Sequence, residues 1–313
     1  MKAVVFRDGE VAWSERPEPE PGPREVLVRV YAAGLNRADL LQQAGHYPPP
    51  HGVPQDQPGL ECAGVVETTG TAVERFVPGD RVMGLLAGAA QAELALMDER
   101  VAMPVPPQCS LVEAGAFPEA FGTAYDALFP QAGLTIGERV LVTGAAGGVG
   151  TAGVQLAAAG GATVIASVRH DDLRDGVTLL GATCTAPEDA LALGPFDIVL
   201  ELVGGPGVPA ALSALASRGR IVVIGVGAGG RVELDLGTMM HRRATLRGST
   251  LRTRSLEDKA LLARQLESHV LPLLSAGALR VVVETTYPFE NVAEAYARFD
   301  TGHKLGKIVL TGP

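Results

Sequence analysis

The sequence predicts an α/β protein in which a doubly wound parallel sheet accompanies a separate β-rich region. From about Leu111 onward, helix-like and strand-like segments alternate, which is typical of a parallel sheet. Residues 1 to roughly 115 instead carry short strand-like runs bounded by glycine and proline. At 313 residues the chain is long enough for two domains, each with its own core.

The first region contains alternating apolar runs that predict strands at residues 26–31 and 63–68. Residues 77–82 predict a turn that leads into another strand, and proline-rich connectors cover 17–23 and 104–107. In the second region, the expected strands are at 140–143, 163–167, 197–200, 220–224 and 246–249.

The C-terminal part is expected to begin with one long amphipathic helix over 255–275, because leucine and valine recur there at helical spacing. A strand at 280–285, a helix at 291–300 and a last strand at 307–310 complete the expected elements.

The most informative stretch is the glycine-rich loop at 144–150, which follows the strand at 140–143 and precedes a helix at 151–159. Such a loop lets backbone approach a pyrophosphate, and the N–H groups of the helix end face the anion. Ala145 stands where the first glycine of the usual pattern would fall, and an ordinary tight strand-to-helix turn is the alternative. The expected cofactor contacts are Gly144, Ala146, Gly147, Gly148, Val149 and Gly150.

Composition limits the classes of partner. The net charge of −9 argues against a broad nucleic-acid surface, which needs a lysine and arginine face. The three cysteines are scattered, which fits a reducing cytoplasm rather than a disulfide framework. The N-terminus lacks the apolar core of a signal peptide, and glycines interrupt the uncharged stretch 140–168. We therefore expect a cytoplasmic protein without a membrane span.

Eight segments together resemble the zinc-free medium-chain dehydrogenases/reductases of the quinone oxidoreductase branch; they are 33–39, 45–50, 58–64, 78–82, 122–125, 144–150, 219–225 and 306–310. The resemblance implies a GroES-like catalytic domain from residues 1–115 and 277–313, and a Rossmann dinucleotide-binding domain from 116–276, with the active site in the cleft.

The resemblance also bears on metal. Zinc enzymes of this superfamily place a cysteine where this chain has Asn36 and a histidine where it has Leu60, and neither replacement is a useful zinc ligand. Glu119, near the position of the third ligand, cannot hold zinc alone, and the six histidines show no ligand spacing. The expectation is an enzyme without metal, suited to acceptors that are already electrophilic.

The expected cofactor is NADPH. The strand at 163–167 ends without the acid that binds the ribose hydroxyl of NAD, and Arg169 follows, which would attract a 2′-phosphate. A solvated surface arginine is the alternative for Arg169. The resemblance implies that Thr123 lies near the nicotinamide ribose, that Gly225, Val226 and Leu251 line the nicotinamide pocket, and that Lys304 and Lys307 reach the phosphates.

Asn36 and Tyr47 are the expected catalytic residues, because in similar proteins both face the nicotinamide ring. An amide and a phenol can donate hydrogen bonds to an oxygen as it gains negative charge. Asp39 is expected in the substrate pocket or as a helix cap, and Tyr125 as a pocket wall or a packed aromatic.

The leading prediction is an NADPH-dependent quinone oxidoreductase that transfers a hydride to a small-molecule quinone. An enoyl or enone reductase is the alternative, and a cofactor-binding protein with a structural or RNA-binding role is the second alternative. A homodimer is expected, with 231–234 as a candidate edge strand.

Overall fold

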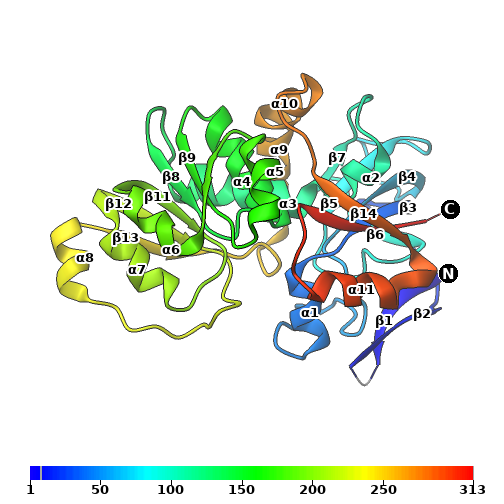
Figure 1. Ribbon diagram of the computed structural model, residues 1–313. Helices are drawn as coiled ribbons and strands as arrows, with labels where there is room; N and C mark the ends of the chain where they lie inside the picture. The colour runs from blue at the N-terminus through cyan, green and yellow to red at the C-terminus, as the bar shows by residue number, and fades with distance from the viewer. Residues whose placement is uncertain (8, 313) are drawn as a thin grey trace. The chain divides into compact units, whose positions relative to one another are not determined.

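The computed structural model describes residues 1–7 and 9–312, and its chain forms two compact units (Figure 1). The first unit comprises Met1–Gly122, Leu251–Gly302 and Lys307–Pro313, and the second comprises Thr123–Thr250 and His303–Gly306. These units differ from the expected domain ranges mainly at 116–122 and 251–276, which belong to the first unit.

The first unit is built on a seven-stranded sheet with the order β14-β15-β3-β4-β5-β7, and β6 pairs with β3. β15, near the C-terminus, lies between β14 and β3, so distant segments share one core. That core packs Val28, Val30, Met97 and Ile308. The strands are β3 (Glu25–Gly34), β4 (Glu61–Thr69), β5 (Arg81–Leu85), β6 (Leu94–Asp98), β7 (Ala102–Pro104), β14 (Val283–Pro288) and β15 (Lys307–Thr311).

A two-stranded hairpin and several helices complete this unit. The hairpin pairs β1 (Lys2–Arg7) with β2 (Glu10–Glu15). The helices are α1 (Arg37–Gln43), α2 (Leu111–Ala114), α9 (Leu256–His269), α10 (Leu271–Ser275) and α11 (Val292–Asp300), and α3 (Pro118–Asp126) continues from the first unit into the second.

The second unit is a six-stranded sheet with the order β10-β9-β8-β11-β12-β13, in which every neighbouring pair is parallel. This confirms the predicted Rossmann sheet, and it brings the carboxyl ends of the strands to one edge. The strands are β8 (Arg139–Val142), β9 (Thr163–Ser167), β10 (Thr183–Thr185), β11 (Phe196–Glu201), β12 (Leu215–Val223) and β13 (Thr245–Gly248). The helices are α4 (Gly148–Ala159), α5 (Arg174–Thr178), α6 (Pro187–Ala190), α7 (Gly207–Ser213) and α8 (Leu236–Arg242).

Three expected elements differ in the structure. Residues 231–234 form no strand, and the two edges of the sheet are β10 and β13. The expected helix over 255–275 is two helices, because the proline ring of Pro272 cannot continue α9 and stands in the first turn of α10. The strand expected at 280–285 begins only at Val283.

Among the described residues, no helix is both long enough and apolar enough to cross a membrane. The uncharged stretch 140–168 is β8, α4 and β9, which are mostly buried in the second unit.

Candidate active site

The glycine-rich loop joins β8 to α4, as the sequence predicts. Gly144 has a φ of +58°, which side-chain-bearing residues rarely adopt, and Gly147 is the N-cap of α4. Within residues 1–7 and 9–312, no side chain caps this twelve-residue helix. The backbone N–H groups of its first turn can therefore face an anionic ligand, together with the positive end of the helix dipole.

Gly147 and Gly150 of the motif have different surroundings. A Cβ built at Gly150 would lie 2.5 Å from the Gly144 carbonyl oxygen and 2.6 Å from the Ala145 Cα, so glycine is needed for α4 to approach the loop. A Cβ at Gly147 would meet only the Gly144 carbonyl oxygen at 3.5 Å. The space at Gly147 is therefore open, and it fits the close approach of a pyrophosphate.

The segment 303–306 lies beside this loop within the second unit. The Gly306 N–H donates to the Ala146 carbonyl at 2.7 Å, and Gly306 forms an isolated parallel bridge with Gly147. The buried Lys304 ammonium donates to the Gly306 carbonyl at 2.6 Å. Of the two lysines expected at the phosphates, Lys304 thus comes next to the loop.

The end of β9 carries Arg169, which is exposed in the bend after Val168. The Arg174 guanidinium donates from Nε to the Val168 carbonyl at 3.2 Å and so holds this strand end. Asp171 and Asp172 lie in a short 3-10 turn before α5 rather than at the strand end.

Glu201, at the end of β11, is a buried residue that sequence reasoning missed. Its Oε1 accepts hydrogen bonds from the Thr143 hydroxyl at 2.8 Å and from the N–H groups of Val203 and Gly204 at 2.7 and 2.8 Å. These hydrogen bonds hold the loop after β11 in place. Gly225 packs closely against that loop, because a Cβ at Gly225 would lie 2.0 Å from the Leu202 carbonyl oxygen. Val226 beside it is half exposed.

In the first unit, Asn36 belongs to a buried polar cluster with Glu61 and Lys307. The Lys307 ammonium donates to Asn36 Oδ1 at 2.6 Å, to Glu61 Oε1 at 2.6 Å and to the Leu35 carbonyl at 2.7 Å. The Asn36 amide donates to Glu61 at 2.9 Å and to the Gly34 carbonyl at 3.2 Å. These contacts use all three hydrogens of the ammonium, which was expected to reach the phosphates.

This cluster does not fit a zinc ion. The polar atoms of Asn36 and Glu61 already face the Lys307 ammonium, and Leu60 contributes only a buried apolar side chain. A zinc ion would need thiolate, imidazole or carboxylate ligands, and it would have to displace an internal cation. The Lys307 ammonium thus lies against Asn36, the residue that the resemblance matches to a cysteine of the zinc enzymes.

Asp39 holds the start of α1. Its carboxylate accepts from the Asn36 N–H at 2.8 Å, from the Gly59 N–H at 3.2 Å and from Gln91 Nε2 at 3.1 Å. Burial raises the pKa of Asp39 to about 6. The Asp39 side chain is almost wholly buried. Its hydrogen bond to the Asn36 N–H is that of a helix cap, which is one of the two roles expected from the sequence.

Tyr47 is half-buried and follows α1. Arg252 holds it: Nη1 donates to the Tyr47 carbonyl at 2.7 Å, and the guanidinium carbon lies 5.2 Å from the centre of the Tyr47 ring. Arg252 is itself buried and donates to Ala87 O and Gln42 Oε1. Burial lowers the pKa of this guanidinium below its ordinary value, but an arginine remains charged at neutral pH.

The remaining expected residues are buried. Thr123 and Tyr125 lie on α3 within the second unit, and the Tyr125 ring packs 5.1 Å from that of Phe129. Burial also raises the pKa of Tyr125. Leu251 is buried in the first unit.

Comparisons with known proteins agree with this architecture. Residues 22–107 match the alcohol dehydrogenase GroES-like domain, and residues 161–310 match the zinc-binding dehydrogenase family. The chain is 31% identical to quinone oxidoreductase-like protein 2 of Bos taurus over 92% of this chain and 85% of that protein.

Two further similarities are to a polyketide synthase protein and to an enoyl reductase. The chain is 34% identical to the spectinabilin polyketide synthase system protein NorB of Streptomyces orinoci, over 93% of this chain but only 13% of that protein. The crystal structure of CurK enoyl reductase is similar over 100% of this chain and 99% of that chain, with a TM-score of 0.86 and 25% identity.

Proposed function

We propose that this chain, which belongs to the medium-chain dehydrogenase/reductase superfamily, is an NADPH-dependent quinone oxidoreductase. Its family membership makes it an oxidoreductase of the quinone oxidoreductase type that binds a nicotinamide cofactor. The observation that supports the proposal is the buried Lys307 ammonium, which donates hydrogen bonds to Asn36 Oδ1 and Glu61 Oε1. Reduction of a strongly electrophilic carbonyl can proceed without a Lewis acid, whereas alcohol oxidation usually needs one.

The residues of the second unit would hold the cofactor. The open space at Gly147 and the uncapped N-terminus of α4 would receive the pyrophosphate, and Arg169 would bind the 2′-phosphate. Thr123, Gly225, Val226 and Lys304 are further proposed contacts in this unit, and Leu251 of the first unit is another. When bound, the cofactor supplies a hydride to the acceptor.

Tyr47 and Asn36 would act on the acceptor oxygen. The phenol of Tyr47 can donate a hydrogen bond as that oxygen gains negative charge, and the buried Arg252 guanidinium beside the ring favours the same charge. The Asn36 amide makes its longer bond, 3.2 Å, to the Gly34 carbonyl, and this is the hydrogen that an acceptor oxygen would take over. Asp39 would act by holding the Asn36 backbone.

An enone or enoyl thioester reductase is the second candidate, favoured by the similarity to CurK enoyl reductase over the whole chain. It would use the same residues, and it differs in accepting the hydride on carbon of an activated double bond.

The deciding experiment is an NADPH-oxidation screen with quinones, enones and enoyl thioesters, run with and without a chelator. We expect the highest kcat/KM for a quinone, unchanged by the chelator. Faster turnover of an enoyl thioester would favour the second candidate, and no turnover with any acceptor would favour a cofactor-binding protein without this activity.

A further inference from the structure

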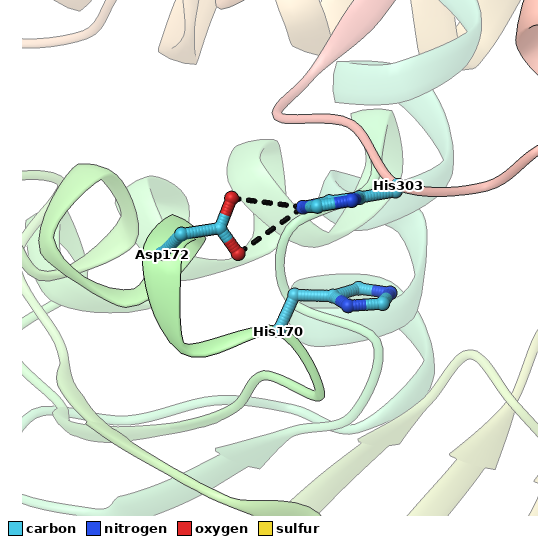
Figure 2. Close-up of side chains that lie close together, drawn as sticks. All are labelled: His170, Asp172 and His303. Atoms are coloured by element: carbon cyan, nitrogen blue, oxygen red, sulfur yellow. Dashed lines mark hydrogen bonds and ion pairs between the residues drawn. The ribbon is translucent and has the colours of Figure 1, made fainter.

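Three side chains of metal-ligating types that have no role in the proposed reaction, His170, Asp172 and His303, meet at the surface of the second unit. Asp172 and His303 are within hydrogen-bond distance: the His303 Nε2 lies 2.8 Å from Asp172 Oδ2 and 3.1 Å from Oδ1. His170 stacks on His303, with ring centres 4.1 Å apart and planes at 17° (Figure 2). One ligand atom from each of the three lies within 4.8 Å of the other two.

The two segments that supply these residues are anchored independently of the cluster. His170 and Asp172 come from the turn between β9 and α5, where the Leu173 N–H donates to the His170 carbonyl at 3.2 Å. On the other segment, Gly306 bonds to Ala146, and a Cβ at Gly176 of α5 would lie only 2.5 Å from a methyl carbon of Leu305. The backbone around the cluster is therefore positioned before any ligand arrives.

We propose that His170, Asp172 and His303 form a binding site for a divalent transition metal ion such as Zn²⁺. Two imidazoles and one carboxylate are a known protein ligand set for zinc, and water would complete the coordination. Imidazole nitrogens favour zinc, cobalt and nickel over magnesium or calcium, which prefer all-oxygen sites.

Binding would require the side chains to turn. The two ring planes are nearly parallel, with centres 4.1 Å apart, so the rings must rotate before a nitrogen of each can face one ion. The His303 side chain is 49% exposed and the Asp172 side chain 61%, so both have room to turn. Binding would replace the Asp172–His303 contact by bonds that link the β9–α5 turn to the 303–306 segment.

The cluster adjoins two of the proposed cofactor contacts, because His170 follows Arg169 and Lys304 follows His303. A metal titration needs neither cofactor nor acceptor, so the proposal does not depend on the proposed function. It also differs from the expectation that the histidines lack ligand spacing: Asp172 and His303 are 131 residues apart in the chain, and only the fold brings them together.

The test is calorimetric titration of untagged, chelator-treated full-length protein with ZnCl₂, CoCl₂ and MgCl₂. We expect one Zn²⁺ site per chain, Co²⁺ binding with visible absorption of a nitrogen-ligated ion, and no Mg²⁺ binding. His303→Ala and His170→Ala should each weaken Zn²⁺ binding at least about tenfold, as loss of a metal ligand or its support typically does. The matched control is His46→Ala, an exposed histidine of the first unit, which should bind like wild type.

A second readout is thermal unfolding. Zn²⁺ should raise the Tm of wild type and of His46→Ala but not that of the His170→Ala/His303→Ala double variant. The proposal is overturned if wild type binds no Zn²⁺, or if the double variant binds it as tightly as wild type.

Discussion

At the scale of single residues, Gly147 and Gly150 are three positions apart but have different roles. Gly150→Ala should destabilise the fold, because its Cβ would overlap loop backbone. Gly147→Val should leave the Tm near that of wild type, since its Cβ position is open, but should place a side chain where the pyrophosphate must approach. We expect a large loss of NADPH affinity in a fluorescence titration. An unchanged titration of folded Gly147→Val would contradict the assignment of the loop.

Arg169 is the residue on which cofactor preference is proposed to depend. A hydrogen-bonded guanidinium–phosphate contact contributes roughly 1.5–3 kcal/mol, so Arg169→Ala should weaken NADPH binding about tenfold to a hundredfold. NADH has no 2′-phosphate and should change little, which makes it the internal control. The effect should shrink at high salt, because the arginine is exposed. Equal losses of kcat/KM for both cofactors would assign Arg169 a structural role.

Tyr47 is the residue whose removal should affect turnover rather than cofactor binding. Tyr47→Phe keeps the ring against Arg252 but removes the hydroxyl donor. We expect kcat with a quinone to fall roughly tenfold, about 1 to 2 kcal/mol of barrier, with the NADPH Kd unchanged. Tyr31→Phe, an exposed tyrosine of the same unit, is the matched control. Full activity in Tyr47→Phe would place the oxygen-stabilising group elsewhere.

At the scale of elements, the start of α1 should make stability depend on pH. The pKa of Asp39 is raised from 3.8 to about 6 in the folded protein, so the folded state binds the proton more tightly than the unfolded state. Its contribution to stability is therefore present at pH 4 and is lost as pH rises through 6, by about 2 to 3 kcal/mol in total.

Denaturant unfolding at pH 4.5 and 7.5 measures this dependence. Wild type should lose stability between these values relative to Asp39→Asn, which does not titrate. Asparagine keeps an acceptor oxygen for only one of the Asn36 and Gly59 N–H groups, so the comparison is of the two pH profiles and not of absolute stability. Parallel pH profiles of the two proteins would show that Asp39 does not carry the shift.

Elements defined by local pattern were predictable, and elements defined by distant partners were not. The strand, glycine loop and helix around Gly147 follow from contiguous residues, so the sequence predicts them closely. Residues 231–234 have a strand-like composition, but strand formation depends on a neighbouring strand, and the sheet ends at β13.

The contacts of the candidate site could not be predicted from local sequence patterns. Lys307 and Glu61 are 246 positions apart in the chain, and Arg252 and Tyr47 are 205 positions apart. The sequence signal for the Glu61 cluster was an acidic residue at the start of a mostly apolar strand, because such a residue needs a polar partner when it is buried.

At the scale of the whole molecule, we propose a homodimer. The edge strand β13 leaves backbone groups of Thr245–Gly248 available on one side of the second unit's sheet, and pairing with a second copy would satisfy them. Sedimentation velocity at micromolar concentration should give a dimer. Leu246→Pro, which removes an N–H from the edge strand, should shift the species toward monomer, whereas a wild-type monomer would refute the proposal.

The interleaving of the two units has a consequence for how the protein is made on the ribosome. The chain passes from one unit to the other after Gly122, Thr250, Gly302 and Gly306, so neither unit is a continuous stretch. β15 is synthesised after both strands with which it pairs, yet it inserts between them, and its first residue is Lys307. A nascent chain therefore cannot close the first unit's sheet, or supply the ammonium that pairs with the buried Glu61, until β15 leaves the exit tunnel. Premature termination just before Lys307 would leave an open sheet and an uncompensated internal carboxylate, a product suited to rapid proteolysis.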